Sequence, residues 1–562
     1  MNKWLGPALA APVTLWLLLA FAAPMIVVVL LSMHAVPDPF GPLFQPPSLA
    51  QFKLVLGDTF YLGVILETVL LGAAVTVISA LLGYPLAFWL TRMPGKWRAL
   101  AFGVILIPLL TNVVVRSLGI MLLLSPDGLI NVALDFLGLP QARTMLFTHG
   151  AVAVGLAQVF MPFMVLALYD TMQSTSPRVH EAAQSLGASP VTRFLTVDLP
   201  LSLPGLRAGI IMVFLMSTTA YVSATLLGGK KVWTIGMLVL QEAISNLNAP
   251  MASALALTMT IVGLAFAALC TLAINRLMPW SNGGRSRPIA LPRWFVLLAE
   301  ITGPVLSRLL LAASLSLLLL PLALVCIQSF NDVPLATAAG FRGFTLKWYE
   351  AVLFGGNYTA AFMVSVKLAV VATLVAMVLA LPAAFALARY PFRGRTALMA
   401  FWLLPLSLPH IAVGVGMLKL LQVYYVIPPF LGLVAIHVVV MLPFVITLLT
   451  ASVLQLDRAQ EEAASSLGAG PVRKLLLIIL PGLAPGFFAA GIVGFLMSFG
   501  EVTVTSFLTT ARMTTLPVRI YSEATFALEP TAHAISAILI VVTIATLAIV
   551  GRLVRLDRLY AR

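Results

Sequence analysis

Few residues of this sequence have the types and spacings that catalysis requires. His180 and Glu181 supply the first two positions of an H-E-x-x-H zinc-protease motif, but Gln184 stands where the second histidine is needed. The segment LGGKKV (227–232) lacks both the spacing and the hydroxyl residue of a phosphate-binding loop. Both cysteines fall inside apolar stretches, where we expect them to pack without forming a disulfide or a metal site. We therefore expect no catalytic residue, metal or cofactor in this chain.

Glu181 belongs to a segment that the sequence contains twice. EAAQSLGASPVTRFLTVDLPLSLPG begins at Glu181, and EAASSLGAGPVRKLLLIILPGLAPG begins at Glu462. Gly187 of the first copy matches Gly468 of the second, and the following prolines keep the same separation. Self-similarity of this kind indicates duplicated structure.

Each copy is expected to form a short helix followed by a sharp turn. Ser176 before Pro177 predicts one helix start, and Asp457 with Gln460 has the spacing of a capping box. The glycine after each EAA triplet permits the backbone to reverse. The paired alanines would let each helix approach another surface closely, so the pattern predicts two equivalent contact sites.

The repeat extends beyond these segments. YPLAFWLTR (84–92) matches LPAAFALAR (381–389), at a larger separation than the EAA segments have. The difference requires an insertion in the first half, which we assign to 125–144, opposite a shorter loop near 422–429. A polar, basic stretch rich in Gly and Pro lies between the halves and predicts a linker. The predicted organisation is a first half (1–275), a cytosolic linker (276–306) and a second half (307–562).

Composition excludes water as the main solvent. The 562 residues are 61% hydrophobic and 9% charged, with a mean hydropathy of +1.06, whereas soluble domains carry about 25% charged residues. Apolar runs of about 20 residues, enough to cross a bilayer as a helix, recur without the alternation of a β-barrel. We predict an all-α integral membrane protein whose two six-helix repeats are parallel. Its spans are expected near 12–33, 62–90, 99–124, 147–170, 205–225, 250–275, 308–329, 359–388, 396–421, 430–451, 485–509 and 532–551.

The net charge of +14 is explained by its placement. With the N-terminus inside, most Lys and Arg residues fall on cytosolic segments, as the positive-inside rule requires. No nucleic-acid partner is needed to account for the basic composition. The first apolar stretch is longer than a signal-peptide core and further spans follow it, so we expect a retained helix. Both termini are then cytosolic.

The EAA segments resemble the motif of ABC importer permeases, in which Glu-Ala-Ala is followed four residues later by glycine in a cytosolic loop. The similarity covers nearly the whole chain and occurs twice. It implies that each segment is a coupling helix that docks on one of two copies of a separate ATPase subunit, which would bind ATP and Mg. It also implies a periplasmic or extracellular solute-binding protein as partner and a location in the bacterial inner membrane, in contact with lipid. The ATPase-coupling residues carried over are Glu181, Ala182, Ala183, Gly187, Glu462, Ala463, Ala464 and Gly468.

Finer resemblances concern the transported solute. MPFMVLALYDTM (161–172) and TLLGGKKVWTIGMLV (225–239) are similar to the first permease subunit of spermidine/putrescine importers, and FNDVPLATAAGFRGFTLKWYEAV (330–352) resembles the second. That group usually has two separate permease chains, whereas fused permeases occur among aminoethylphosphonate, ferric-iron and thiamine importers. The resemblance implies a small polar solute, a polyamine or an aminoethylphosphonate-like amine. Ferric iron or thiamine is the alternative.

Arg116 and Glu501 are ionisable residues in apolar segments, where a charge is costly unless it faces the bundle interior or a pathway. Their repeat counterparts, Val413 and Ala220, are uncharged, so the expected pathway is chemically asymmetric. We take Arg116, Glu501 and Tyr221 as candidate pathway residues. In the alternative interpretation the two charged residues are structural, either solvated at the outer interface or paired with each other.

A transporter driven by an ion gradient is a different class that also commonly has about twelve spans. It would place coupling carboxylates near the bilayer centre. It offers no role for duplicated EAA segments, which therefore favour the ATP-driven permease.

Overall fold

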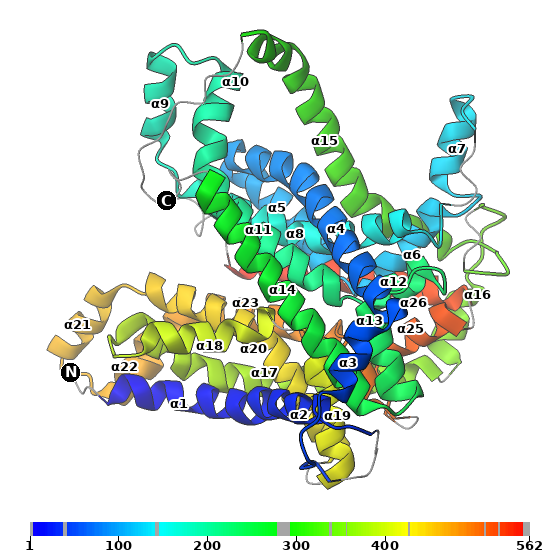
Figure 1. The fold of residues 1–562 in the computed structure, drawn as a ribbon. Helices are drawn as coiled ribbons and strands as arrows, with labels where there is room; N and C mark the ends of the chain where they lie inside the picture. The colour runs from blue at the N-terminus through cyan, green and yellow to red at the C-terminus, as the bar shows by residue number, and fades with distance from the viewer. Residues whose placement is uncertain are drawn as a thin grey trace.

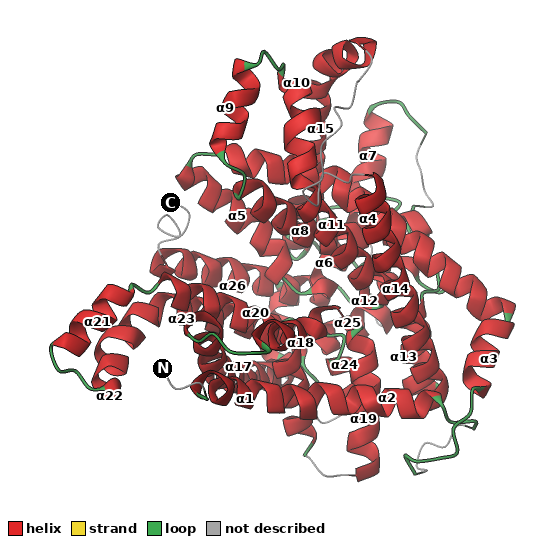
Figure 2. Cartoon of the chain, turned by 60° about the vertical axis from the view of Figure 1, so that its left-hand side comes forward, coloured by secondary structure: helices red, strands yellow, loops and turns green. Residues whose placement is uncertain are grey.

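The computed structural model describes residues 4–36, 42–140, 145–277, 293–336, 340–355, 357–407, 409–424, 428–510, 513–526 and 529–554. Within these ranges the chain is built of helices, and its only extended pairings are two isolated bridges, Asn331 with Phe344 and Thr510 with Met513. Figure 2 shows this helical architecture. The predicted all-α class is confirmed.

The first half contributes fourteen helices. They are α1 (Leu5–Leu17), α2 (Ala23–Ser32), α3 (Ala50–Gly57), α4 (Thr59–Arg92), α5 (Gly95–Leu110), α6 (Val113–Leu124), α7 (Leu129–Phe136), α8 (His149–Gln173), α9 (Pro177–Ser185), α10 (Pro190–Arg193), α11 (Leu199–Thr219), α12 (Val222–Gly228), α13 (Ile235–Leu240) and α14 (Ala249–Leu277). π-helical segments join α1 to α2 (Leu18–Ala22) and α10 to α11 (Phe194–Asp198), and another follows α13 (Gln241–Ser245).

In the described ranges the second half repeats this order, except that the single helix α15 takes the place of α1 and α2 and α7 has no counterpart. Its helices are α15 (Arg293–Gln328), α16 (Lys347–Phe354), α17 (Asn357–Arg389), α18 (Arg395–Ser407), α19 (His410–Tyr424), α20 (Pro429–Gln455), α21 (Arg458–Ser466), α22 (Pro471–Lys474), α23 (Leu480–Phe499), α24 (Thr505–Leu508), α25 (Leu516–Phe526) and α26 (Thr531–Val554), with a π-helical segment (Leu475–Ile479) between α22 and α23. α15 begins inside the segment 276–306 that we expect to be a linker, and residues 278–292 lie outside the described ranges.

The number of spans agrees with the prediction. In the described part of the chain, 11 helices are long and apolar enough to cross a membrane, and one bent helix pair raises the total to 12. Two predicted spans, 99–124 and 396–421, are not continuous helices, however. The first is broken between α5 and α6, and the second is the bent pair of α18 and α19, which meet at 87°. The break before α6 is capped by Asn112, whose side chain accepts the Val114 amide at 2.6 Å.

The spans predicted at 205–225 and 485–509 extend too far. α11 ends at Thr219 and α23 ends at Phe499, and the short helices α12 and α24 follow in new directions. Glu501 therefore lies just beyond the end of α23 and is not inside a continuous helix. Apolar composition continues across each break, so hydropathy alone could not locate it.

The two EAA segments lie at the same end of the molecule. Figure 1 shows α9 and α21 on its left-hand side, which we call the motif end, and α21 lies near the start of α1. α7 and α16 lie at the opposite end, which we call the distal end. α7 falls in the predicted insertion 125–144, and α20 begins too soon after α19 for an equivalent helix to exist in the second half.

The first long helix of each half packs against the other half. α1 contacts α17, and α15 contacts α4 and α6. In Figure 1 the dark-blue α1 lies along the yellow-green helices of the second half, while the green α15 runs beside the blue α4. The halves are thus interlocked by exchanged helices.

Two glycines at equivalent places in the repeat permit these crossings. A Cβ added to Gly119 in α6 would lie 2.2 Å from the carbonyl oxygen of Pro321 in α15. A Cβ added to Gly416 in α19 would lie 2.2 Å from the carbonyl oxygen of Pro24 in α2. Neither backbone can approach so closely if the glycine carries a side chain, as at small-residue contacts between membrane helices generally.

Gly119→Val and Gly416→Val are expected to lower the amount of folded protein. Overpacking costs about 1–3 kcal/mol in a well-packed core, and here the added atoms would meet backbone, which cannot rotate away. Gly103→Val is the matched control, because a Cβ on that helical glycine meets nothing within 4 Å. Size-exclusion chromatography of detergent-extracted protein measures the outcome. Equal monodisperse yields for all three variants would contradict this role of the two crossings.

Candidate functional site

The two EAA helices begin where the sequence predicts. α9 follows Ser176, and α21 follows Asp457, whose carboxylate accepts the Ala459 amide at 2.9 Å. That bond satisfies one of the amides that have no partner at a helix start. Both helices span nine residues, so the two copies present surfaces of equal length.

Each EAA helix ends in the same hydrogen-bonded turn. Gly187 has φ +77°, and the amide of Ala188 donates to the Ala183 carbonyl at 3.1 Å. Gly468 has φ +80°, and the amide of Ala469 donates to the Ala464 carbonyl at 2.9 Å. These are Schellman motifs, in which glycine adopts a left-handed conformation that other residues avoid. The predicted reversal is confirmed in both halves.

The predicted coupling residues are mostly at the surface. Those exposed are Glu181, Ala182, Gly187, Glu462, Ala463 and Gly468, whereas Ala183 is half-buried and Ala464 is buried. Sequence reasoning missed the largest exposed apolar groups of these segments, Leu186 and Leu467. Each has 88% of its surface exposed. They occupy equivalent places in the repeat, and that equivalence is the signal that could have identified them. The glycine turn that follows each leucine directly is thus matched by an equally exposed apolar side chain in both halves.

In the second half, one ion pair joins the EAA helix to the long helix α17. Arg389 at the end of α17 lies 2.8 Å from the Glu461 carboxylate and donates a 3.1 Å hydrogen bond to the Leu456 carbonyl. The side chains of Arg389 and Glu461 are 13% and 24% exposed. Partial burial makes such a pair more effective than a solvated surface pair.

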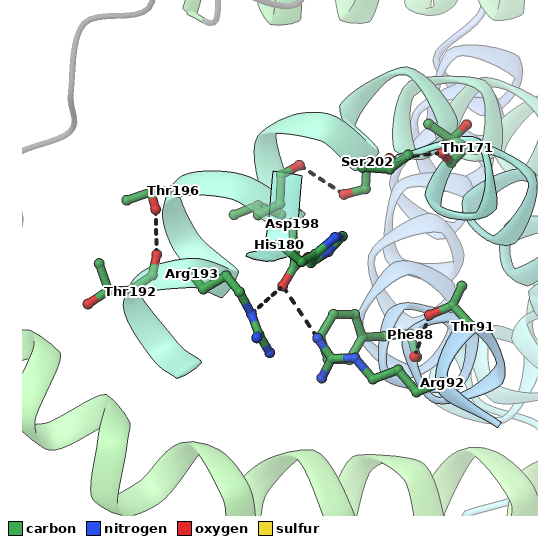
Figure 3. A network of polar contacts seen from close by, with 12 residues as sticks. Phe88, Thr91, Arg92, Thr171, His180, Thr192, Arg193, Thr196, Asp198 and Ser202 are labelled. Atoms are coloured by element: carbon green, nitrogen blue, oxygen red, sulfur yellow. Dashed lines mark hydrogen bonds and ion pairs between the residues drawn. The ribbon is translucent and has the colours of Figure 1, made fainter. Parts of the chain in front are cut away.

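In the first half, a larger network occupies the same place (Figure 3). The Asp198 carboxylate lies 2.6 Å from Nε2 of His180, 3.6 Å from Arg92 and 3.9 Å from Arg193. The Asp198 side chain is only 7% exposed, so its charge depends on these cationic and hydrogen-bonding neighbours. The Arg92 guanidinium also stacks over the Phe88 ring, 3.7 Å from its centroid.

Arg116 is buried in α6, with 5% of its surface exposed. Its guanidinium donates to the Val159 carbonyl of α8 at 3.3 Å, and its Nε has no hydrogen-bond partner within the described residues. Glu501 accepts the Val504 amide at 3.0 Å, which orients its carboxylate at the break after α23. Arg116 and Glu501, both described, do not form an ion pair with each other.

Contacts between the halves converge on the helix breaks. The Tyr221 hydroxyl donates to Ser506 of α24 at 2.7 Å, and its ring meets the Tyr521 ring edge to face at 5.9 Å. The Asn112 side chain donates to the Gly500 carbonyl at 3.2 Å, joining the break before α6 to the break after α23. Irregular backbone is tolerated at membrane depth only where protein or a cavity satisfies it. The structure thus brings Glu501 and Tyr221 to breaks that meet between the halves.

No group of three or more His, Cys, Asp or Glu side chains in the described ranges is arranged to hold a metal ion. The polar contacts described above are hydrogen bonds and ion pairs. The prominent surface features of the site are two matched helices at the motif end.

Comparison with protein families agrees with this geometry. The chain matches the family described as binding-protein-dependent transport system inner membrane component over residues 83–282 and 376–556. Each matched segment lies in one half and contains one EAA helix. The match covers more than half of the chain, and the protein belongs to this family of ABC transporter permeases, with two copies of the permease unit in one polypeptide.

Individual relatives are similar over part of the chain. The spermidine/putrescine transport system permease protein PotB of Haemophilus influenzae is 34% identical over 37% of this chain and 73% of its own length. The PotC permease protein of the same kind of system from Escherichia coli (strain K12) is 29% identical over 43% of this chain and 90% of its own length. A crystal structure of a bacterial alginate ABC transporter, in complex with its alginate pentasaccharide-bound periplasmic protein, aligns with a TM-score of 0.42 and 16% identity, over 49% of this chain and 96% of that chain.

Proposed function

We propose that this chain supplies both transmembrane halves of an ATP-driven importer that moves a small polar amine from the periplasm to the cytosol. The observation that carries the proposal is the pair of matched EAA helices, each with an exposed leucine and a glycine turn, at one end of a duplicated inner-membrane permease. Hydrolysis of ATP takes place on a separate subunit that docks on these helices. Alternating access of a central pathway to the two sides then moves the solute.

The motif end is assigned to the cytosol. Arg92, Arg193, Arg389, Arg473 and Lys474 all belong to helix ends or π-helical junctions there. Such an excess of basic residues is typical of the cytosolic side. This orientation places α9 and α21 where an ATPase subunit can reach them and places both chain termini in the cytosol.

A single chain that carries both EAA helices should assemble with two ATPase copies. Native mass measurement of the detergent-purified complex is expected to give one copy of this chain and two copies of its ATPase subunit. A complex with two copies of this chain would contradict the proposal, because it would carry four docking helices. If the chain associated with no ATPase subunit at all, the proposed ATP-driven function itself would be contradicted.

Docking should depend on the exposed leucines and glutamates. Leu186→Ser with Leu467→Ser, or Glu181→Lys with Glu462→Lys, should weaken ATPase association at least about tenfold, since removing interface anchors commonly costs about 1–2 kcal/mol each. Membrane insertion should be unchanged, because these residues lie outside the apolar spans. Leu137→Ser is the control: Leu137 is 67% exposed but lies beyond α7 at the distal end. Pull-down of the ATPase measures the outcome, and unchanged association in both double variants would refute the docking role.

The amine-bearing solute is supported by the chemistry at the helix breaks and by the relatives. Glu501 uses one carboxylate oxygen to accept the Val504 amide, and no described residue forms an ion pair with it. A carboxylate held at a break between the halves suits a cationic solute group. Two of the relatives are named as permease proteins of spermidine/putrescine transport systems, and these solutes are cationic amines. Polyamines and aminoethylphosphonate-like amines share the cationic group.

Glu501→Gln should lower uptake of a labelled amine about tenfold or more, because a charge-assisted hydrogen bond is worth about 1.5–3 kcal/mol. The affinity of the solute-binding protein should stay the same, since capture occurs on another polypeptide. Glu529→Gln serves as the control, because Glu529 is exposed near the start of α26. Uptake into proteoliposomes with the ATPase enclosed measures the effect. Normal uptake in Glu501→Gln would remove this residue from the pathway.

A further inference from the structure

The two halves attach their EAA helices to the bundle through an arginine at the same place in the repeat. Arg92 ends α4 in the YPLAFWLTR segment, and Arg389 ends α17 in the matching LPAAFALAR segment. Arg92 contacts Asp198, which also meets α9, and Arg389 contacts α21, so both arginines lie beside the EAA helices. Each contacts an acidic group, but the acidic group comes from a different element in each half.

In the second half the acid is on the EAA helix itself. Glu461 lies in the first turn of α21, one residue before Glu462 of the EAA triplet, and pairs directly with Arg389 at 2.8 Å. The same guanidinium donates to the Leu456 carbonyl at the end of α20. One arginine thus connects α17, α20 and α21.

In the first half the position that corresponds to Glu461 is His180. The acidic residue of the first half is instead Asp198, and the equivalent position in the second half is the apolar Ile479. His180 of α9 meets the Asp198 carboxylate at 2.6 Å, and Asp198 in turn faces Arg92 at 3.6 Å (Figure 3). The first half therefore also connects its long helix α4 to its EAA helix α9, but through Asp198 as an intermediate residue.

Asp198 is well placed to transmit movement. It closes the π-helical segment Phe194–Asp198 and directly precedes α11, which extends 21 residues, about 30 Å, to the break beside Tyr221. α11 also packs along α4 and α8. A displacement of α9 that is carried through His180 and Asp198 thus acts on one end of a rigid helix whose other end lies at the junction of the halves.

We propose that these arginine-centred links are the mechanical tethers of the importer, with His180, Asp198 and Glu461 as positioning residues that carry ATPase movement into the membrane helices. This inference rests on the proposed function. The EAA helix supplies the docking surface, whereas the tether decides how much of its displacement reaches the pathway. The halves use different tethers, one direct and one relayed.

The test separates transmission from docking and from folding. The complex with its ATPase is reconstituted with Ser506→Cys as a reporter, in a chain that also carries Cys270→Ala and Cys326→Ala. Ser506 contacts Tyr221 across the halves, so maleimide labelling of the reporter cysteine on ATP addition reports separation at that point. ATP hydrolysis is measured on the same samples, and the ratio of labelling rate to hydrolysis rate is the readout.

Asp198→Ile and Glu461→Gln are each expected to lower this ratio about threefold or more, with ATPase association unchanged. The decisive variant is Asp198→Ile combined with His180→Glu. It installs the second-half arrangement in the first half, with a carboxylate on α9 for Arg92, and should recover most of the ratio that Asp198→Ile loses. Asp170→Asn is the control, because Asp170 is exposed at the end of α8 and belongs to no tether.

The outcomes have distinct meanings. A normal ratio in Glu461→Gln and Asp198→Ile, or no recovery in the combined variant of a well-folded Asp198→Ile, would overturn the tether. If Asp198→Ile does not fold, Glu461→Gln decides alone, because the Glu461 side chain is more exposed than that of Asp198 and the substitution keeps its size and hydrogen-bonding groups. If the chain without tether substitutions neither associates with the ATPase nor shows ATP-dependent labelling, the proposed function itself fails.

Discussion

The fold depends on two places where backbones of opposite halves touch. Gly119 meets Pro321, and Gly416 meets Pro24, each at a distance that only a glycine allows. In lipid, apolar side chains gain little by leaving one apolar surface for another, so helix association relies on close packing and hydrogen bonds. These crossings supply such packing twice, around a pseudo-twofold axis. Because each half packs its first long helix against the other half, the two halves can separate only if these helix contacts are broken.

The interlock constrains where the molecule can move. The crossings and the contacts of Tyr221 and Asn112 lie between the halves, while α9 and α21 extend from them at the motif end (Figures 1 and 2). Each broken helix leaves backbone groups that lipid could not satisfy. Asn112 caps the start of α6, and Glu501 accepts the Val504 amide in the turn before α24, so their side-chain oxygens satisfy some of these groups. At Glu501, backbone hydrogen bonding and candidate pathway chemistry thus use the same side chain.

Much of this architecture was predictable because it follows from composition and repetition. The length of the apolar runs predicted the number of spans, and the glycine after each EAA triplet predicted the turns at Gly187 and Gly468. The breaks after α11 and α23 were not predictable, because hydropathy is unchanged where the chain alters direction. The role of Asp198 was hidden as well: its counterpart is Ile479, and only three-dimensional structure shows that it lies beside His180 and Arg92. Leu186 and Leu467 were visible in the repeat but unremarkable until their exposure was known.

The helix α7 makes the distal end of the molecule differ between its two halves. It lies at the distal end of the first half, and the short connection from α19 to α20 leaves no room for a counterpart. A molecule that approaches this end therefore meets two unlike surfaces on either side of the pseudo-twofold axis. For an asymmetric protein, two docked orientations related by a half-turn would have equal energy on a perfectly duplicated permease. Here the two orientations differ by every contact that α7 makes or obstructs, so α7 gives a docked protein one preferred orientation relative to the two halves.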